Sequence, residues 1–347
     1  MVRIKRVFAV GMLLAILSGC SSASPQATSG LSKRYQATFL NLFDTVTTIV
    51  GYAQSEEAFQ SVAQDIHDEL EQYHQLYDIY NEYPGMNNLK IVNDRAAQEP
   101  VEVDARIIQL LEFSKELYQE TGGTVNVAMG SVLSLWHETR EAGIANPDQA
   151  ALPEEEALKT AAEHTDLSSV EVNRERGTVF FTDALVKLDV GAIAKGYALE
   201  QVCQNAPEGL LISVGGNVRA TGPKPTDGQP WVVGIQHPDN PEEYLHTVYV
   251  QELSVVTSGD YQRYYTVDGV EYHHIIDPAT GYPARLWQSV TVLCEDSGLA
   301  DGLSTALFLL PQPQGQALLD RFGAEAVWVS LDGETQYSSG FEAYIRT

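Results

Sequence analysis

LDVGAIAKGYA, residues 188–198, is the segment around which the rest of this sequence is organised. The mostly apolar run at 184–188 predicts a strand, and the residues from Ala194 onward predict a helix that reaches about Asn205. The small residues let the backbone approach another group closely. Backbone N–H groups at a helix N-terminus, with Lys195 beside them, suit an anion such as a phosphate. The alternative is an ordinary strand–turn–helix junction with a solvated lysine.

Composition narrows the class of protein. A chain of 347 residues is long enough for one large domain or two smaller ones with a substantial core. The apolar content of 44% and the charged content of 20% are globular values. The formal net charge of −26 leaves no basic excess for a nucleic-acid partner. A bound phosphate would therefore need local positive charge, backbone dipoles or a metal.

Residues 1–20 predict a targeting segment. A basic start is followed by an apolar stretch at 7–17, which is too short for a comfortable membrane span. The ending LSGC resembles a bacterial lipoprotein signal, in which Cys20 receives a lipid and becomes the new N-terminus; a plain secretory signal is the alternative. Residues 21–34 predict a flexible tether and 35–347 the folded part. We expect an exported protein anchored at the outer face of the cytoplasmic membrane, or facing the periplasm.

The pattern along the folded part predicts helices and strands without strict alternation. An apolar stripe at spacings of three and four runs from Phe59 to Tyr80 and predicts a helix that starts near Ser55. Asp268-Gly269 predicts a hairpin turn. The other expected helices lie at 104–120 and 297–310, and the expected strands include 210–214, 254–258, 272–276, 289–294 and 342–345. This mixture predicts an α+β fold, and no linker separates two folded domains.

Two cysteines remain after Cys20, namely Cys203 in a predicted helix and Cys294 in a predicted strand. In an exported chain they could form a disulfide. Each could equally be buried and free, and the sequence leaves both possibilities open.

The segment Asp301-Gly302-Leu303-Ser304-Thr305 is the first candidate for chemistry. On a helix, Asp301 and Thr305 share a face because they are four residues apart. A carboxylate with hydroxyl and backbone oxygens suits Mg²⁺ better than a soft metal. The alternative is that these residues only cap or decorate the start of a helix. The apolar surroundings favour the metal, since a carboxylate on a buried helix needs a partner.

Three other segments are weaker candidates. His273 and His274 would point to opposite faces of a strand, so they form a poor paired metal site, although one could meet a phosphate or a ring. Gly215-Gly216-Asn217 could be a close-approach loop or an ordinary hairpin turn. The segment 257–265 offers hydroxyls, rings and Arg263, and could be a ring-stacking and phosphate edge or a polar loop.

Together these segments resemble the ApbE family, the Mg²⁺-dependent FAD:protein FMN transferases exported by bacteria. The resemblance runs from about Leu40 to the C-terminus, and it rests on the order of several modest motifs: Phe43-Asp44-Thr45, Tyr77-Asp78-Ile79-Tyr80-Asn81, Gly123-Thr124-Val125-Asn126-Val127, 188–197, Gly215-Gly216-Asn217, Thr257-Ser258-Gly259-Asp260, His274-Ile275-Ile276-Asp277-Pro278 and 300–307. It implies one T-fold-related α+β catalytic unit with a mixed, largely antiparallel sheet flanked by helices.

The resemblance also implies roles for individual residues. Asp189 and Lys195 resemble FAD contacts, and His274 resembles a residue near the diphosphate with a catalytic role. The implied Mg²⁺ site consists of Asp301, Thr305 and the carbonyl of Ala192. The implied flavin or adenine pocket contains Tyr80, Thr124, Val125, Asn126 and Ile276. Some family members have a second acid where this chain has Ser304, which implies one carboxylate fewer at the metal.

The implied reaction transfers FMN from FAD to a threonine or serine of a separate exported or membrane protein and releases AMP. Mg²⁺ and Lys195 would stabilise the leaving group, and Asp301 or His274 would take the proton of the incoming hydroxyl. Asp277 to Gly281 faintly resembles the acidic-x-x-Thr-Gly sequence that the family modifies, but a structural turn explains it better. Two alternatives are an Mg²⁺-dependent FAD pyrophosphatase that uses water and a flavin-binding lipoprotein without catalysis.

Overall fold

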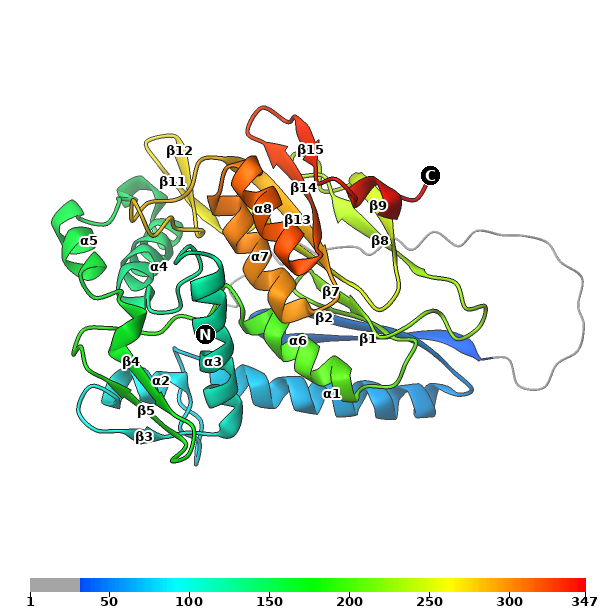
Figure 1. Cartoon of the computed structure of the whole chain (residues 1–347), viewed down its shortest axis with the longest axis horizontal. Helices are drawn as coiled ribbons and strands as arrows, with labels where there is room; N and C mark the ends of the chain where they lie inside the picture. Colours follow the sequence, from blue (N-terminus) through cyan, green and yellow to red (C-terminus); the bar gives the residue numbers. More distant parts are fainter. Residues whose placement is uncertain (1–31) are drawn as a thin grey trace, which may run out of the picture.

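The computed structural model describes residues 32–347, so the predicted targeting segment, Cys20 and most of the predicted tether lie outside the described residues. An eight-stranded sheet forms the centre of the molecule (Figure 1). Its strands, in spatial order, are β1 (Lys33–Leu42), β2 (Thr45–Ala53), β6 (Leu211–Val214), β7 (Asn217–Ala220), β10 (Ser254–Gly259), β13 (Trp287–Cys294), β14 (Glu325–Ser330) and β15 (Thr335–Tyr337).

Both faces of this sheet are buried, because alternate side chains along a strand enter different cores. In β2, Ile49 contributes to the core under the helices and its neighbour Val50 to the core on the other side. The helices on the first face are α1 (Glu56–Tyr77), α6 (Ala194–Asn205), α7 (Ser297–Leu309) and α8 (Gln312–Phe322). The second face is covered by the hairpin of β8 (Trp231–Gln236) and β9 (Tyr244–Val250) and by the short helix η3 (Phe341–Tyr344).

A smaller region lies beside the helices, at the left of Figure 1. It contains the three-stranded sheet β3-β5-β4, the hairpin β11–β12 and several helices. Their bounds are β3 (Val101–Glu102), β4 (Val170–Asn173), β5 (Thr178–Phe181), β11 (Tyr264–Val267), β12 (Val270–His273), α2 (Leu89–Arg95), α3 (Ala105–Glu120), α4 (Gly130–Ala145), η1 (Pro147–Gln149), α5 (Glu155–Ala162) and η2 (Leu167–Ser169).

The expected α+β class with a largely antiparallel sheet flanked by helices is confirmed, since every ladder in the described residues is antiparallel. The helix predicted from Ser55 begins there because the Ser55 hydroxyl accepts a hydrogen bond from the Ala58 N–H at 3.2 Å. The predicted turn at Asp268-Gly269 joins β11 to β12, and both residues have positive φ. Cys203 and Cys294 are both buried and free.

Four local predictions were wrong. Residues 184–188 form no strand, and they take part only in an isolated parallel bridge between Met129 and Lys187, which belongs to no ladder. Strand β12 ends at His273 rather than Ile276, and residues 341–344 form a short helix instead of a late strand. The apolar stripe outlasts its helix, because α1 ends at Tyr77 where Asp78 turns extended, so Tyr80 lies beyond it.

Candidate functional site

Asp301 lies at the contact between α6 and α7. Helix α7 is largely apolar and packs on β10 and β13, so its carboxylate is carried into the interior and is only 5% exposed. The Asp301 Oδ2 accepts a hydrogen bond from the Gly196 N–H at 2.8 Å, and the Lys195 ammonium lies 3.9 Å from the same oxygen. Burial raises the pKa of Asp301, while Lys195, the Gly196 N–H and the Asn217 amide act against this increase.

Gly196 is required by the packing of these two helices. A Cβ atom at this position would lie 2.3 Å from the Ser297 carbonyl oxygen and 2.4 Å from the Asp301 Cβ. The close approach expected of the glycines is therefore made by Gly196 to α7. At Gly191 a Cβ would meet only Asp189, at 3.1 Å from its Oδ1.

The Gly196 hydrogen bond has a consequence one turn earlier in the chain. In a regular helix, the Gly196 N–H would donate to the carbonyl of Ala192. It donates to Asp301 instead, and no residue that the structure describes donates to the Ala192 carbonyl. An unpaired carbonyl is a suitable ligand for a hard cation.

Hydroxyl groups complete this oxygen-rich corner. The Thr305 hydroxyl lies 3.4 Å from the Asp301 carbonyl oxygen, one turn along the same face of α7. Ser304 occupies the position at which some family members have an acid, and its hydroxyl donates to the Asp301 carbonyl at 2.8 Å and bonds the Ser258 hydroxyl at 2.8 Å. One carboxylate, a hydroxyl and a bare carbonyl fit Mg²⁺ by their chemistry.

A group of basic side chains faces this corner. His274 follows β12, and its Nδ1 is buried without a partner. Burial, followed by the charge of Arg263 and then by His273, Arg140 and Lys195, lowers the pKa of His274 to about 3. The imidazole is therefore neutral at physiological pH. By contrast, the neighbouring His273 is a core residue, with its Nε2 at 2.8 Å from the Ala284 carbonyl oxygen.

Asp189 and Tyr80 lie in the same electrostatic neighbourhood. Asp189 does not cap α6, whose N-cap is Ile193; its Oδ1 accepts from the Gly191 N–H at 2.9 Å. Burial raises the pKa of Asp189, opposed by that N–H and by His137, Arg140 and Arg263. The Tyr80 ring is 53% exposed and stacks on His137 with centroids 4.9 Å apart. Burial and the Asp189 charge raise the pKa of Tyr80 to about 12.

The other predicted pocket residues have structural partners. Val125 is buried and its N–H donates to the Thr121 hydroxyl. The Asn126 amide donates to the Thr165 carbonyl at 2.8 Å and accepts from the Ala128 N–H at 2.9 Å. Ile276 belongs to the core between α4, α5 and β11. Thr124 is half-buried. No contact of these four residues joins them to Asp301 or Lys195 in the described part of the chain.

His137 and Arg140 were missed by the sequence analysis. The available signal was weak: Arg140 is the one lysine or arginine in the sequence of α4, three residues after a histidine. No motif marks either residue. Arg263 had been singled out only as part of a possible phosphate edge, and its charge does act on Asp189 and His274.

Residues 277–281 form the expected turn. The Gly281 N–H donates to the Asp277 carbonyl at 2.8 Å, the Asp277 Oδ1 accepts from the Ala279 N–H at 2.8 Å, and Gly281 has a φ of 72°. The Thr280 hydroxyl accepts from the Tyr282 N–H at 3.2 Å. Local hydrogen bonds therefore account for the sequence of this turn.

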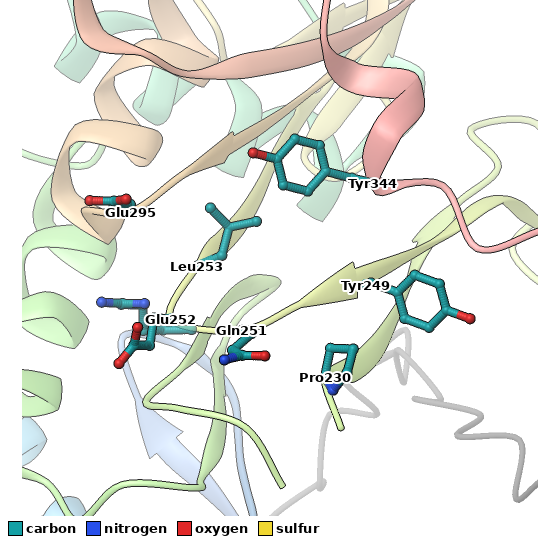
Figure 2. Close-up of a pocket in the computed structure, with 8 residues that line it drawn as sticks. Pro230, Tyr249, Gln251, Glu252, Leu253, Glu295 and Tyr344 are labelled. Atoms are coloured by element: carbon teal, nitrogen blue, oxygen red, sulfur yellow. The ribbon is translucent and has the colours of Figure 1, made fainter. Parts of the chain in front are cut away.

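A hollow of about 410 Å³ lies elsewhere, between the β8–β9 hairpin, η3 and the start of α7 (Figure 2). None of the predicted site residues lines it; its lining is Arg219, Pro230, Tyr249, Gln251, Glu252, Leu253, Glu295 and Tyr344. Arg219 is held by the buried Glu200, with its Nε 3.3 Å from the Glu200 Oε2. Because its one cation, Arg219, is paired with Glu200 and none of the candidate residues lines it, we do not assign the chemistry to this hollow.

Two further findings concern metals and membranes. Among the residues that the structure describes, His67, Asp68 and Glu71 on α1 bring three possible ligand atoms within 4.8 Å of one another, but they share no residue with the corner around Asp301. No helix at 32–347 has the length and apolar character needed to span a bilayer.

Comparisons with a family model, with related sequences and with solved structures all point to the same family. The model of the ApbE family matches residues 43–328. The FAD:protein FMN transferase of Treponema pallidum is 32% identical over 360 residues, covering 97% of this chain and 95% of that protein. The crystal structure of the ApbE protein from Thermotoga maritima matches with a TM-score of 0.80 at 31% identity, covering 91% of this chain and all of that one (100%). The flavin transferase ApbE from Vibrio cholerae matches at 0.74 and 25% identity, covering 90% and 99%.

Proposed function

The chain belongs to the ApbE family, and from this premise we propose that it transfers FMN from FAD to a hydroxyl group of a separate protein, with AMP as the leaving group. The acceptor is a threonine or serine side chain, and the product is a flavin linked through a phosphoester. The observation that carries this proposal is the contact of Asp301 with Lys195 and with the Gly196 N–H, which leaves the Ala192 carbonyl without a donor among the described residues. These residues offer oxygen ligands for a hard cation such as Mg²⁺. Lys195, beside them, offers a positive charge for a phosphate.

The Asp301 carboxylate, the Thr305 hydroxyl and the Ala192 carbonyl would hold Mg²⁺, which neutralises charge on a diphosphate when it is bound. Lys195 lies beside Asp301 and would bind the same diphosphate from the helix N-terminus. Lys195 would then stabilise the negative charge that develops on the departing AMP.

The transfer step requires a base for the acceptor. The acceptor oxygen attacks the phosphorus of the FMN half, the bond from that phosphorus to the bridging oxygen breaks, and AMP leaves with the electron pair. The acceptor proton passes to the Nδ1 of His274, which is neutral and has no hydrogen-bond partner. A bound diphosphate would offset the cations around His274 and so increase its basicity.

The test uses FAD, Mg²⁺ and a peptide that contains the acidic-x-x-Thr-Gly sequence, with covalent flavin and AMP as readouts. We expect AMP and flavinylated peptide in equal amounts, and chelation of Mg²⁺ should stop both. The Asp301→Asn variant should lose activity on the order of 1,000-fold. The matched control is Asp296→Asn, because Asp296 caps the same helix and Asn caps equally well.

Two outcomes would contradict the proposal. Free FMN with AMP, at the same rate with and without the peptide, indicates a pyrophosphatase that uses water. FAD binding without AMP under either condition indicates a flavin-binding protein without catalysis. Full Mg²⁺-dependent turnover in the Asp301→Asn variant would contradict the metal assignment alone.

We also propose that the protein is exported and held at the membrane by a lipid on Cys20, with FAD and an exported acceptor as its partners. The support is the sequence pattern of residues 1–20. The Cys20→Ser variant should appear in the soluble fraction of cells, whereas the wild type should sediment with membranes and incorporate labelled fatty acid. A membrane-bound, labelled variant would refute the anchor.

A further inference from the structure

Arg140 is a largely covered arginine whose guanidinium lacks a close carboxylate. Its side chain is 15% exposed. Within the described residues, its side chain makes one hydrogen bond, from a terminal nitrogen to the His137 Nδ1 at 3.0 Å. Among the described residues, the carboxylate within 4.0 Å of it is that of Glu141, 3.8 Å from the Arg140 Nε and itself 59% exposed. Most of the five guanidinium donors therefore have no protein acceptor.

Helix α4 carries Arg140 to the same place as His274 and Arg263. The Trp136 indole donates to the Gly281 carbonyl at 2.8 Å, which ties α4 to the loop that follows His274. On the other side of the hairpin, the Tyr265 hydroxyl lies 3.5 Å from the Thr139 hydroxyl, and Tyr265 directly follows Tyr264 at the start of β11. Arg263 precedes that strand, so the hairpin β11–β12 packs its two ends against α4.

Positive charges outnumber negative ones at this place. Arg140, Arg263 and Lys195 all act on His274, and Arg263 also acts on Arg140. Asp189 is the carboxylate whose charge acts on Arg140 from across the site, and Glu141 acts on it from its own helix. Three cations therefore share the region with two inward carboxylates, Asp189 and Asp301, and Asp301 lies beside Lys195, so Arg140 and Arg263 have Asp189 as their inward counter-charge.

The repulsion between these cations can be reduced in two ways, by the loss of a proton or by the binding of an anion. A histidine can lose its proton, but a guanidinium remains charged at any pH that a folded protein tolerates. A buried charge with incomplete pairing is costly, so an anion is needed to satisfy it. The planar fork of arginine matches two oxygens of one phosphate.

We propose that Arg140 is a nucleotide-binding residue, which contacts the diphosphate of the dinucleotide and holds His137 against Tyr80. The hydrogen bond between Arg140 and the His137 Nδ1 fixes the orientation of the His137 ring. That ring supports one face of Tyr80, and the exposed remainder of Tyr80 is available for a flavin or adenine ring. This inference rests on the proposed function and extends it by assigning two residues that no motif marks.

The test is FAD binding, measured by flavin fluorescence with EDTA present so that turnover does not occur. The Arg140→Gln variant should bind FAD at least about tenfold more weakly than the wild type, because a charged, bidentate contact is lost. Inorganic pyrophosphate should displace FAD from the wild type and do so poorly from the variant. The matched control is Arg174→Gln, since Arg174 is 72% exposed and pairs only with Glu112.

Unchanged FAD affinity in a folded Arg140→Gln protein overturns the inference. If that variant does not fold, Arg140→Lys keeps the charge without the fork and should bind FAD several-fold more weakly; wild-type affinity in it overturns the inference as well. A wild type that neither binds FAD nor releases AMP would instead contradict the proposed function, so the two failures are distinguishable.

Discussion

Arg219 and Arg140 are equally covered by the protein, with side chains 14% and 15% exposed, but their partners differ. Arg219 lies 3.3 Å from Glu200, which is itself buried and also accepts from the Ser297 N–H at 2.9 Å. Arg140 has a histidine nitrogen at 3.0 Å and the exposed Glu141 carboxylate at 3.8 Å. Arg219 therefore has a buried carboxylate as its partner, whereas the described residues provide no buried carboxylate within 4.0 Å of Arg140.

This difference in pairing identifies the candidate ligand site better than the presence of a hollow does. The hollow of about 410 Å³ belongs to the paired arginine, and the residues that suit a dinucleotide gather around the unpaired one. A buried polar group that the protein satisfies needs nothing further, whereas one left unsatisfied indicates an absent partner. The pairing of charges is therefore the better guide to the site in this fold.

The largest effect on stability is expected at the paired arginine. Glu200→Gln keeps an acceptor for the Ser297 N–H but leaves the Arg219 charge uncompensated, so the free energy of unfolding should fall by about 3 kcal/mol. Urea denaturation measures this change. FAD affinity per folded molecule should stay within about threefold of the wild type.

The control for this prediction is Glu252→Gln, which changes an exposed carboxylate of the same hollow and should alter stability by less than about 0.5 kcal/mol. A Glu200→Gln protein as stable as the wild type but unable to bind FAD would reverse the comparison, because Arg219 would then belong to the ligand site.

The next effect concerns His274 and pH. Its folded pKa of about 3 lies below the ordinary value of 6.5, so the unfolded chain binds the extra proton first as pH falls. This contribution to stability is complete above about pH 6.5 and decreases below it. Between pH 6.5 and about pH 5, the wild type should lose about 2 kcal/mol relative to His274→Asn. Parallel stability curves for the two proteins would show that the fold does not lower the pKa of His274.

The smallest effect is expected at Asp260, where carboxylates rather than cations are crowded together. Burial, followed by Glu271 and Asp239, raises the pKa of Asp260 from 3.8 to about 6, and Arg285 opposes this. A raised carboxyl pKa stabilises the fold at low pH, and this contribution is lost as pH rises through about 6. Asp260→Asn should therefore stabilise the protein by about 1 kcal/mol at pH 7.5, allowing for the partial exposure of Asp260.

The gain in Asp260→Asn should shrink as pH is lowered toward about 4, which thermal melts at several pH values can follow. A pH-independent gain would point to packing rather than charge. The contrast with Arg140 is physical: crowded carboxylates take up protons, and crowded guanidiniums need an anion.

Much of the fold could be predicted because local rules decide it. Ser55, Asp104 and Asp296 each accept a hydrogen bond from an N–H in the first turn of a helix, and apolar spacing gave the buried faces of these helices. Residues 184–188 failed because a distant side chain takes the place of a strand there. The Asn93 amide accepts from the Leu188 N–H at 2.7 Å and donates to its carbonyl at 2.9 Å, across 95 residues of sequence.

The site was predictable to the same extent. Asp301, Lys195 and Gly196 lie in short segments whose spacing already suggested a cation and a phosphate, and they do meet. His137 and Arg140 could not be found in this way, since their position depends on how α4 packs against the β11–β12 hairpin. Spacing within one helix gave no sign of that packing.

Helix α6 connects the candidate ligand site with the ion pair of Arg219. It offers the Gly196 N–H to Asp301, and one turn later it offers Glu200 to Arg219. Four residues of helix rise by about 6 Å, so the ion pair sets both the height and the rotation of the residues that face the ligand. A chimera that received α6 from another member of the family would therefore also need a β7 residue that pairs with position 200, as Arg219 does here. Without that ion pair, the position of the grafted helix relative to the ligand site would no longer be fixed.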